Sequence, residues 1–258
     1  MENCYLADDE RLDVVNDDIS LIQKKTGLTF GTDALLLASY VERIKDARAL
    51  ELGGGTGIIS LLVLTRNKAR SVTALEIQPY YAELIRRNAH LNGMEERLTA
   101  IETDACDYTE SDTESYHIVM TNPPYMTASG ILNVHPEKAI ARHELHGGIE
   151  DFCQTAAKHL RYGGYFYCVH RPERLTDLFF AMRSCGIEPK KLTFVHADKS
   201  APPSLVLVKG KRGAARGLVC TKPFFLYADE AHTKESDEYA YILQKGSFPR
   251  ETKGVRYE

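Results

Sequence analysis

Short apolar runs alternate with longer amphipathic segments through most of the chain. Five runs have the length and the Val, Ile, Leu and aromatic content of β-strands: 47–53, 71–77, 98–104, 116–122 and 165–170. Segments with helical periodicity lie between several of these runs: 56–67, 79–92, 149–160 and 172–185. Pro79 suits the first turn of a helix and Asn92-Gly93 its end, and Gly163-Gly164 predicts a turn before the fifth run. Two further apolar runs, 191–197 and 204–211, have no helix between them, so we expect them to pair antiparallel.

Alternating strands and helices are typical of an α/β fold. We expect a seven-stranded, mostly parallel sheet with helices on both faces. The boundaries predicted from the pattern are an N-terminal cap segment at 1–45, a main domain at 46–212 and a C-terminal extension at 213–258. The cap segment contains an expected helix that starts at Thr32 or Asp33. Residues 1–26 carry no clear periodicity.

Composition excludes several classes of protein. The chain has 258 residues with 43% hydrophobic content, and no apolar run approaches the ~20 residues of a membrane span. Its first ten residues lack the pattern of a secretory leader, so we expect a cytoplasmic protein. The six cysteines form no C-x-x-C pair, which favours reduced thiols and no metal site. A net charge of −4 provides no global basic field, although local patches can still bind phosphates.

A glycine-rich loop follows the first run and precedes the first helix. It reads E-x-G-x-G-x-G, with Glu51, Gly53, Gly55 and Gly57 at the fixed positions. The dinucleotide pattern G-x-G-x-x-G does not fit, because Ile58 stands where its third glycine would fall. Glycines let the backbone approach a ligand closely. Glu51 would repel a pyrophosphate and attract an ammonium group, so the loop favours a ligand with an amino-acid end.

Two more acids end the second and third runs. Glu76, followed by Ile77, lies at the distance from the loop expected of an acid that binds ribose hydroxyls. Asp104, followed by Ala105, is placed to approach the exocyclic amine of a base. Each feature alone has a bland explanation as a turn or a solvated residue. Together they describe a site for S-adenosylmethionine, with Glu51, Gly53, Gly55, Gly57, Glu76, Ile77, Asp104 and Ala105 as the expected cofactor-binding residues.

The fourth run ends in Asn122-Pro123-Pro124-Tyr125. Prolines cannot donate to a sheet, so the strand must stop at Asn122. The amide oxygen of Asn122 and the carbonyl of Pro123 can each accept one N–H of a planar amine, and Tyr125 can stack on it. We therefore expect these four residues to be catalytic, mostly by positioning. Termination of a buried strand is the simpler alternative for the two prolines.

The segments ELGGGTG, LEI and TNPPY, in this order, resemble the class I S-adenosylmethionine-dependent methyltransferases that act on planar nitrogens. TDALLLA, ARHE and the K-G-x-R-G run near the end resemble one subfamily, the tRNA1(Val) adenine-N(6)-methyltransferases. The resemblance extends over residues 12–245 and implies a Rossmann-like fold, S-adenosylmethionine as cofactor and methylation of an adenine beside the anticodon of a tRNA. The family loop usually starts with Asp, which Glu51 replaces here.

Basic residues provide candidate contacts to RNA. Arg142 could contact a phosphate or pair with a nearby glutamate, and Lys211 and Arg212 lie in the densest basic run of the chain. A solvated surface is the alternative for each of them. The resemblance implies a tRNA as the partner, and we expect no membrane or metal to be involved. The sequence leaves the oligomeric state open, with a monomer favoured.

Other functions remain as alternatives or are disfavoured. The same motifs fit an N-methyltransferase that acts on another RNA or on a protein glutamine. A glutamine enzyme would carry an additional N-terminal helical domain, for which the residues before 46 leave little room. A nicotinamide oxidoreductase is disfavoured by the glycine spacing and Glu51. A non-catalytic relative would have lost Asn122 or a loop glycine, and none is lost.

Overall fold

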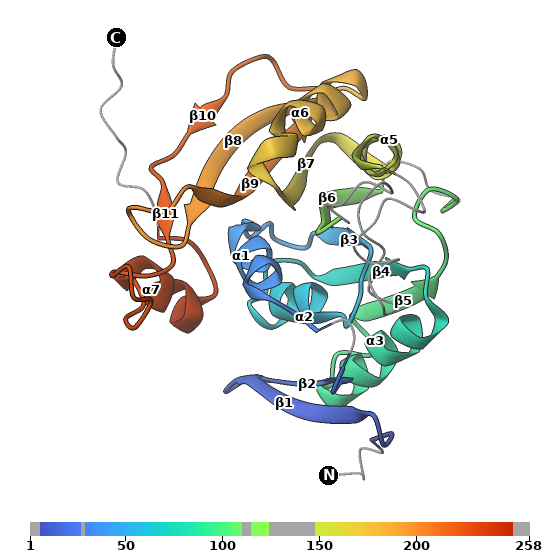
Figure 1. Cartoon of the computed structure of the whole chain (residues 1–258). Coiled ribbons are helices and arrows are strands. Elements are labelled where there is room, and N and C mark those ends of the chain that lie inside the picture. The colour runs from blue at the N-terminus through green and yellow to red at the C-terminus, as the bar shows by residue number, and fades with distance from the viewer. Residues whose placement is uncertain (1–5, 27–28, 110–114, 124–147, 250–258) are drawn as a thin grey trace.

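A nine-stranded sheet forms the centre of the protein (Figure 1). The computed structural model describes residues 6–26, 29–109, 115–123 and 148–249. Neighbouring strands follow the order β10-β8-β9-β7-β6-β3-β4-β5, and β11 pairs with β8. The strands are β3 (Arg48–Leu52), β4 (Ser71–Glu76), β5 (Leu98–Glu102), β6 (Tyr116–Thr121), β7 (Leu160–His170), β8 (Ile187–His196), β9 (Pro203–Arg212), β10 (Val219–Cys220) and β11 (Phe224–Phe225).

The predicted seven-stranded, mostly parallel sheet is confirmed, and two strands of two residues each extend it beside β8. β3, β4, β5, β6 and β7 are parallel. β9 runs antiparallel to both β7 and β8, as the missing helix between the last two runs predicts. The sheet is therefore parallel except at one strand.

One local prediction was wrong. Gly163 and Gly164 read as a turn before a strand, but β7 continues through them from Leu160. The pairing with β6 shifts register here, since Tyr116 pairs with Leu160 and Ile118 with Tyr165. Gly163 has a φ of 79°, and a Cβ on Gly164 would lie 2.9 Å from a backbone oxygen. The glycines thus form an irregularity inside the strand, where side chains do not fit.

Helices cover both faces of the sheet (Figure 1). One face carries α1 (Thr32–Tyr40), α2 (Ile58–Thr65) and α3 (Pro79–Leu91), and the other carries α5 (Ile149–His159), the 3₁₀ turn η1 (Pro172–Arg174) and α6 (Leu175–Ser184). The hydrophobic core on the face that carries α1 and α2 is called the first core, and the core on the face that carries α5 and α6 the second core. α2 is apolar on nearly all sides because it lies inside the first core. Pro79 begins α3, and Gly93 follows it with a φ of 62°, as the sequence predicts. Each face therefore has a hydrophobic core of its own.

The N-terminal residues form a hairpin that sequence periodicity did not reveal. β1 (Glu10–Asn16) and β2 (Ile19–Lys24) pair antiparallel as a separate two-stranded sheet. Figure 1 shows the hairpin beside α3, away from the central sheet. Ile22 is fully buried and packs with Tyr81 and Leu84 of α3. The hairpin is thus anchored to a helix of the main domain.

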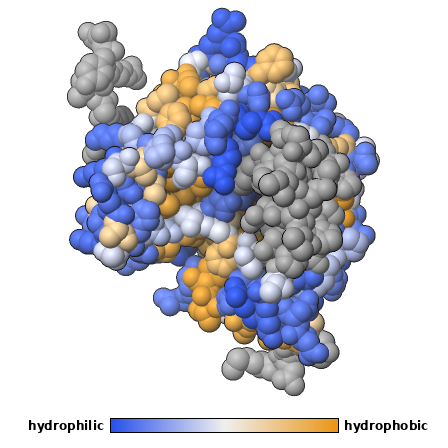
Figure 2. Space-filling model, viewed as in Figure 1, coloured by the Kyte–Doolittle hydropathy of each residue, from blue (hydrophilic) through white to orange (hydrophobic). Residues whose placement is uncertain are grey.

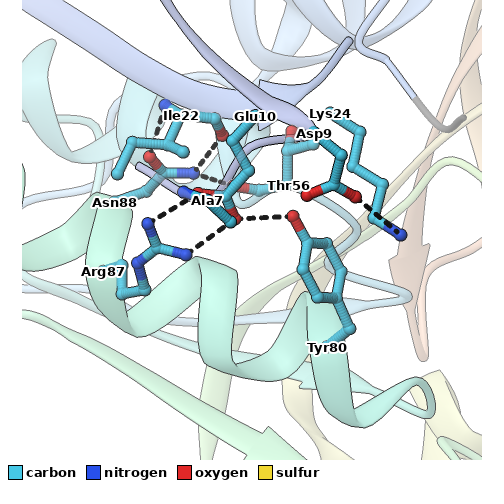
Figure 3. A network of polar contacts seen from close by, with 9 residues as sticks. All are labelled: Ala7, Asp9, Glu10, Ile22, Lys24, Thr56, Tyr80, Arg87 and Asn88. Atoms are coloured by element: carbon cyan, nitrogen blue, oxygen red, sulfur yellow. Dashed lines mark hydrogen bonds and ion pairs between the residues drawn. The ribbon is translucent and has the colours of Figure 1, made fainter. Parts of the chain in front are cut away.

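A polar network reinforces this anchor (Figure 3). The Glu10 carboxylate accepts hydrogen bonds from both terminal nitrogens of Arg87, at 2.7 and 2.8 Å, and from the Tyr80 hydroxyl at 2.7 Å. Only 3% of Glu10 is exposed. The hydrogen bonds from Arg87, more than any other contact, lower the pKa of Glu10 to about 2. A buried charge in the hairpin is therefore fully partnered by α3.

Asn88 of α3 links the hairpin to the glycine loop (Figure 3). Its Oδ1 accepts from the Ile22 N–H at 2.7 Å, and its Nδ2 donates to the Ile22 carbonyl at 3.0 Å and the Thr56 carbonyl at 2.9 Å. The side chain is fully buried. One amide therefore satisfies backbone groups of two segments that are distant in the sequence.

Replacing Asn88 with alanine is expected to lower the free energy of unfolding by about 2–4 kcal/mol, because three buried backbone groups lose their partner. Urea unfolding monitored by circular dichroism measures the loss. Asn92→Ala is the matched control, since Asn92 directly follows the same helix and bonds both backbone groups of Ser20 in the hairpin, whereas Asn88 also bonds Thr56 of the loop. Equal effects of the two substitutions would contradict a special link to Thr56.

The C-terminal segment returns to the sheet beside β8. Helix α7 (Asp237–Lys245) starts at Ser236, whose side chain accepts from the Tyr239 N–H at 3.0 Å. Phe224 of β11 contacts the ring of Tyr239, and Phe248 contacts Tyr40 of α1 with ring centroids 5.3 Å apart. Aromatic contacts therefore join this segment to the same face as α1.

Surface hydrophobicity is scattered. Figure 2 shows hydrophilic residues over much of this face, with hydrophobic residues in patches between them. The most exposed large apolar side chains are Val14 on β1, Tyr162 on β7 and Phe180 on α6, which lie on different elements. Within the described ranges, none of the helices has the length and apolar character that a bilayer crossing requires.

Candidate active site at the carboxyl ends of the parallel strands

Four predicted site residues lie at or near the carboxyl ends of the parallel strands. β3 is paired with both β4 and β6, and Leu52 aligns with Leu75 on one side and Thr121 on the other. Glu76 aligns with Glu102 near the end of β5. The strands are parallel, so the residues at their carboxyl ends lie together: Glu51, Glu76, Asp104 and Asn122. In open α/β sheets, ligands bind at the carboxyl ends of the strands.

The glycine loop leaves β3 with a backbone that other residues rarely adopt. Gly53, Gly55 and Gly57 have φ values of 78°, 54° and 84°. Gly57 directly precedes α2. Apart from its two chain neighbours, no atom of the described residues lies within 4 Å of the position that a Cβ on Gly53 would occupy. The loop backbone therefore turns sharply in a way that its glycines permit.

Gly54 has a packing role that sequence reasoning did not assign. A Cβ on it would lie 2.7 Å from Cδ1 of Ile85 in α3 and 3.3 Å from Cβ of Ala74 in β4. The loop therefore lies directly against α3 and β4. Three consecutive glycines were the signal, because the x positions of the motif do not require glycine.

Glu51 is buried, with 1% of its surface exposed. Oε2 accepts from the backbone N–H of Ser60 at 3.1 Å and from its hydroxyl. Oε1 has no hydrogen-bond partner among the residues that the structure describes. Burial raises the pKa of Glu51 to about 8. A buried acceptor that lacks a partner fits a cationic group of a ligand, such as an ammonium.

Ser60 is a further residue that the motif search missed. It lies at the centre of the hydrogen bonds to Glu51 and is itself fully buried. The available signal was a serine within the otherwise apolar start of α2.

Glu76 braces the loop from β4. Its Oε2 accepts from the Gly55 N–H at 2.8 Å, and its Oε1 accepts from the Gln78 N–H at 2.9 Å. Glu76 is 5% exposed, and this burial raises its pKa against the effect of its backbone hydrogen bonds. Each carboxylate oxygen retains lone pairs for a ligand. Ile77 follows at the strand end and is half-buried.

Asp104 follows β5, the strand next to β4. Its Oδ1 accepts from the Cys106 N–H at 2.8 Å, which shapes a turn after β5. The preceding residue, Thr103, donates its N–H to the Glu76 carbonyl at 3.0 Å, so this turn is attached to the end of β4. Ala105 is 8% exposed and belongs to the second core.

Asn122 follows β6 and is half-buried, and Pro123 is buried. Nδ2 of Asn122 donates to Oδ2 of Asp33 at 3.1 Å. The Thr121 hydroxyl donates to the Leu52 carbonyl at 2.9 Å, which ties the end of β6 to the start of the glycine loop. Pro124, Tyr125 and Arg142 lie outside the described residues.

The structure does not bring Lys211 and Arg212 to the carboxyl ends of the parallel strands. Lys211 pairs with Tyr165, which also aligns with Ile118 of β6, four positions before Asn122. At ~3.3 Å per residue, this is roughly 13 Å back along the strands. Lys211 lies 5.4 Å from the centre of the Tyr165 ring, and Arg212 donates to the Leu160 carbonyl. β9 runs antiparallel to β7, so its last residues lie at the amino ends of the parallel strands.

The described residues contain no group of three or more His, Cys, Asp or Glu side chains with the arrangement of a metal site.

Comparison with known proteins places the chain among methyltransferases. Residues 25–178, more than half of the chain, match the family described as "Methyltransferase small domain". Two similar relatives carry the name tRNA1(Val) (adenine(37)-N6)-methyltransferase. The protein from Shewanella amazonensis is 33% identical over 72% of this chain and 79% of its own length. The protein from Phocaeicola vulgatus is 26% identical over 72% of this chain and 78% of its own length.

Solved structures share the fold. A predicted O-methyltransferase from Agrobacterium tumefaciens superposes with a TM-score of 0.70 at 24% identity, over 84% of this chain and 98% of that one. TYW2 of P. horikoshii, solved in complex with MeSAdo, has a TM-score of 0.58 at 17% identity, over 81% of this chain and 74% of that one. At these identities the likeness concerns the fold alone.

Proposed function

Because this chain belongs to the methyltransferase small domain family, and within it to the tRNA1(Val) (adenine(37)-N6)-methyltransferases, we propose that it methylates the exocyclic amine of an adenine beside the anticodon of tRNA1(Val). The observation that carries the proposal is that Asn122 and the glycine loop lie side by side at the carboxyl ends of β3 and β6. Action in the cytoplasm as a monomer, with tRNA as the partner, belongs to the same proposal.

The loop residues fit S-adenosylmethionine as the cofactor. Glu51 would receive its ammonium group, because Oε1 is buried and lacks a partner among the described residues. Glu76 would accept from its ribose hydroxyls and Asp104 from its adenine amine, while Gly53, Gly55 and Gly57 let the backbone approach closely. Ile77 and Ala105 would line the site between the acids. When bound, this cofactor supplies an activated methyl group on a sulfonium.

Asn122 and Pro123 would hold the substrate amine. The lone pair of an adenine amine is delocalised into the ring, so positioning must present it. If Oδ1 of Asn122 and the Pro123 carbonyl each accept one N–H, the lone pair faces away from both acceptors. Pro124 would stiffen this turn, and Tyr125 would stack on the base. Orientation of this kind contributes ~7–11 kcal/mol in well-positioned reactions.

Phosphate contacts would come from Arg142 and, at the amino ends of the parallel strands, from Lys211 and Arg212. A tRNA is long enough to reach these residues while one of its bases lies in the site. An anticodon-loop base is already single-stranded, so turning it into the site costs only a few kcal/mol. The antiparallel direction of β9 limits Lys211 and Arg212 to contacts remote from the reacting base.

Binding of S-adenosylmethionine is expected to release up to about one proton at about pH 6.5. The pKa of Glu51 is about 8, so its carboxyl is protonated in the free protein, and an ammonium partner favours the ionised form. The α-amino group of the ligand is already protonated at this pH. Calorimetry in buffers of different ionisation enthalpy measures the release. Glu51→Gln should bind without it, and an undiminished release in that variant would exclude Glu51 as the source.

The proposed function is tested by methyl transfer from labelled S-adenosylmethionine into unmodified total tRNA, with a total-protein extract in parallel. Digestion of the RNA and mass analysis of the nucleosides identify the product. N(6)-methyladenosine in tRNA1(Val) is the expected result. Label only in protein would replace the RNA substrate by a protein glutamine, and label in another RNA would change the substrate alone.

A further inference from the structure

We propose that Asp33 is a positioning residue that fixes the side-chain amide of Asn122 so that its oxygen faces the substrate amine. The inference rests on the proposed function, in which Asn122 holds that amine. Asp33 lies in the first turn of α1, and Asn122 follows β6, so the pair joins two elements 89 residues apart in the sequence.

The chemistry of the pair determines the direction of the amide. Oδ2 of Asp33 lies 3.1 Å from Nδ2 of Asn122. A carboxylate only accepts hydrogen bonds, whereas the two ends of an amide differ, since the NH2 donates and the oxygen accepts. The NH2 of Asn122 must therefore face Asp33. Its oxygen is therefore turned away from the carboxylate.

This direction matters because the two ends of an asparagine amide have nearly the same shape. A flipped Asn122 would present N–H donors to an amine that also donates. The substrate would then lose one of the two acceptors that orient its lone pair. Asp33 would prevent the flip without touching the substrate.

Asp33 is itself held in place. Its Oδ1 accepts from the Ala34 N–H at 2.9 Å. A Cβ on Gly31 would lie 2.8 Å from this oxygen, so a larger residue there would displace the carboxylate. Leu36 and Leu37 of the same helix are fully buried in the first core, which fixes α1 against the sheet. The carboxylate is thus presented by a rigid element.

The test compares Asp33→Asn with the parent enzyme in steady-state methylation of tRNA. If the asparagine keeps its oxygen as the acceptor for the Ala34 N–H, its NH2 faces Asn122 and can pair only with the flipped orientation of that amide. We expect kcat to fall at least tenfold, with KM for both substrates within twofold and an unchanged melting temperature. Asp177→Asn is the matched control, because Asp177 lies in the first turn of α6. It should leave kcat unchanged.

A second measurement does not depend on activity. The side-chain NH2 signals of Asn122, identified by their loss in Asn122→Ala, are followed by hydrogen exchange in nuclear magnetic resonance spectra. Asp33→Ala should speed their exchange at least tenfold, while signals of Asn88 stay unchanged. A parent enzyme inactive on tRNA would overturn the proposed function, and the exchange rate would still decide the role of Asp33. A kcat within twofold of the parent, a matching rise in KM, or unchanged exchange would overturn the inference.

Discussion

Asn122→Ala is expected to lower the rate of methyl transfer by about 10²–10³-fold, the usual cost of losing one positioned polar group at a reacting centre. The substitution removes the amide oxygen that would accept from the substrate amine. The Pro123 carbonyl, which belongs to the backbone, remains as a single acceptor. One acceptor fixes the direction of one N–H but leaves the amine free to rotate, so its lone pair is no longer directed.

Cofactor binding separates this role from a structural one. Asn122 donates to Asp33 of α1, and the substitution leaves Glu51, Glu76 and the loop glycines unchanged, so the dissociation constant for S-adenosylmethionine should stay within about threefold of the parent value. Calorimetry measures this constant, and single-turnover kinetics measure the transfer step. Asn92→Ala, just after α3 and bonded to Ser20 of the hairpin, serves as the control with full activity. Lost cofactor affinity in Asn122→Ala would assign the residue to the cofactor site instead.

Glu76→Ala should weaken binding of S-adenosylmethionine by ~1.5–3 kcal/mol, or about 10- to 150-fold, the range for hydrogen bonds to a charged group. Two effects act together. The ligand loses the carboxylate that would bind its ribose, and the Gly55 and Gln78 N–H groups lose the acceptor that braces the loop. The maximal rate at saturating cofactor should change far less than the affinity, because Asn122 is untouched.

Two further variants sharpen the result for Glu76. In Glu76→Gln one oxygen becomes an NH2, which would face either the Gly55 or the Gln78 donor, so this variant should also bind weakly. Glu102→Ala is the matched control, since Glu102 is the partner of Glu76 on β5 but is exposed. Its affinity should equal that of the parent. If Glu76→Ala also bound as tightly as the parent, the ribose role would be wrong.

Local pattern was sufficient to predict the seven longer strands of the main sheet, although not β10, β11 or the full length of β7. Parallel strands buried on both sides are nearly continuous apolar runs, and the helices between them carry their own start and end signals, such as Pro79 and Gly93. The hairpin at Glu10–Lys24 escaped prediction because its stability depends on partners elsewhere in the chain. Arg87 and Asn88 provide those partners, and no local periodicity records them.

The candidate site divides in the same way. Glu51, Glu76, Asp104 and Asn122 could be predicted to lie together from their positions alone. Each lies within two residues of the carboxyl end of a parallel strand, and these ends lie on the same side of the sheet. Lys211 and Arg212 could not be placed by this rule, since β9 runs antiparallel to β7 and places them at the amino ends of the parallel strands.

The sequence by itself therefore determined the chemistry: the residue types, their order and the strand ends that hold them are written in short local motifs. Only the tertiary structure decided which groups act on those motifs from a distance. Asp33 accepts a hydrogen bond from Asn122, Asn88 donates to the Thr56 carbonyl, and Ser60 donates to Glu51. These contacts form because helices packed on the sheet bring their residues close to the carboxyl ends of its strands. The geometry of a hydrogen bond depends on ångström-scale packing of the whole core, which no single segment encodes.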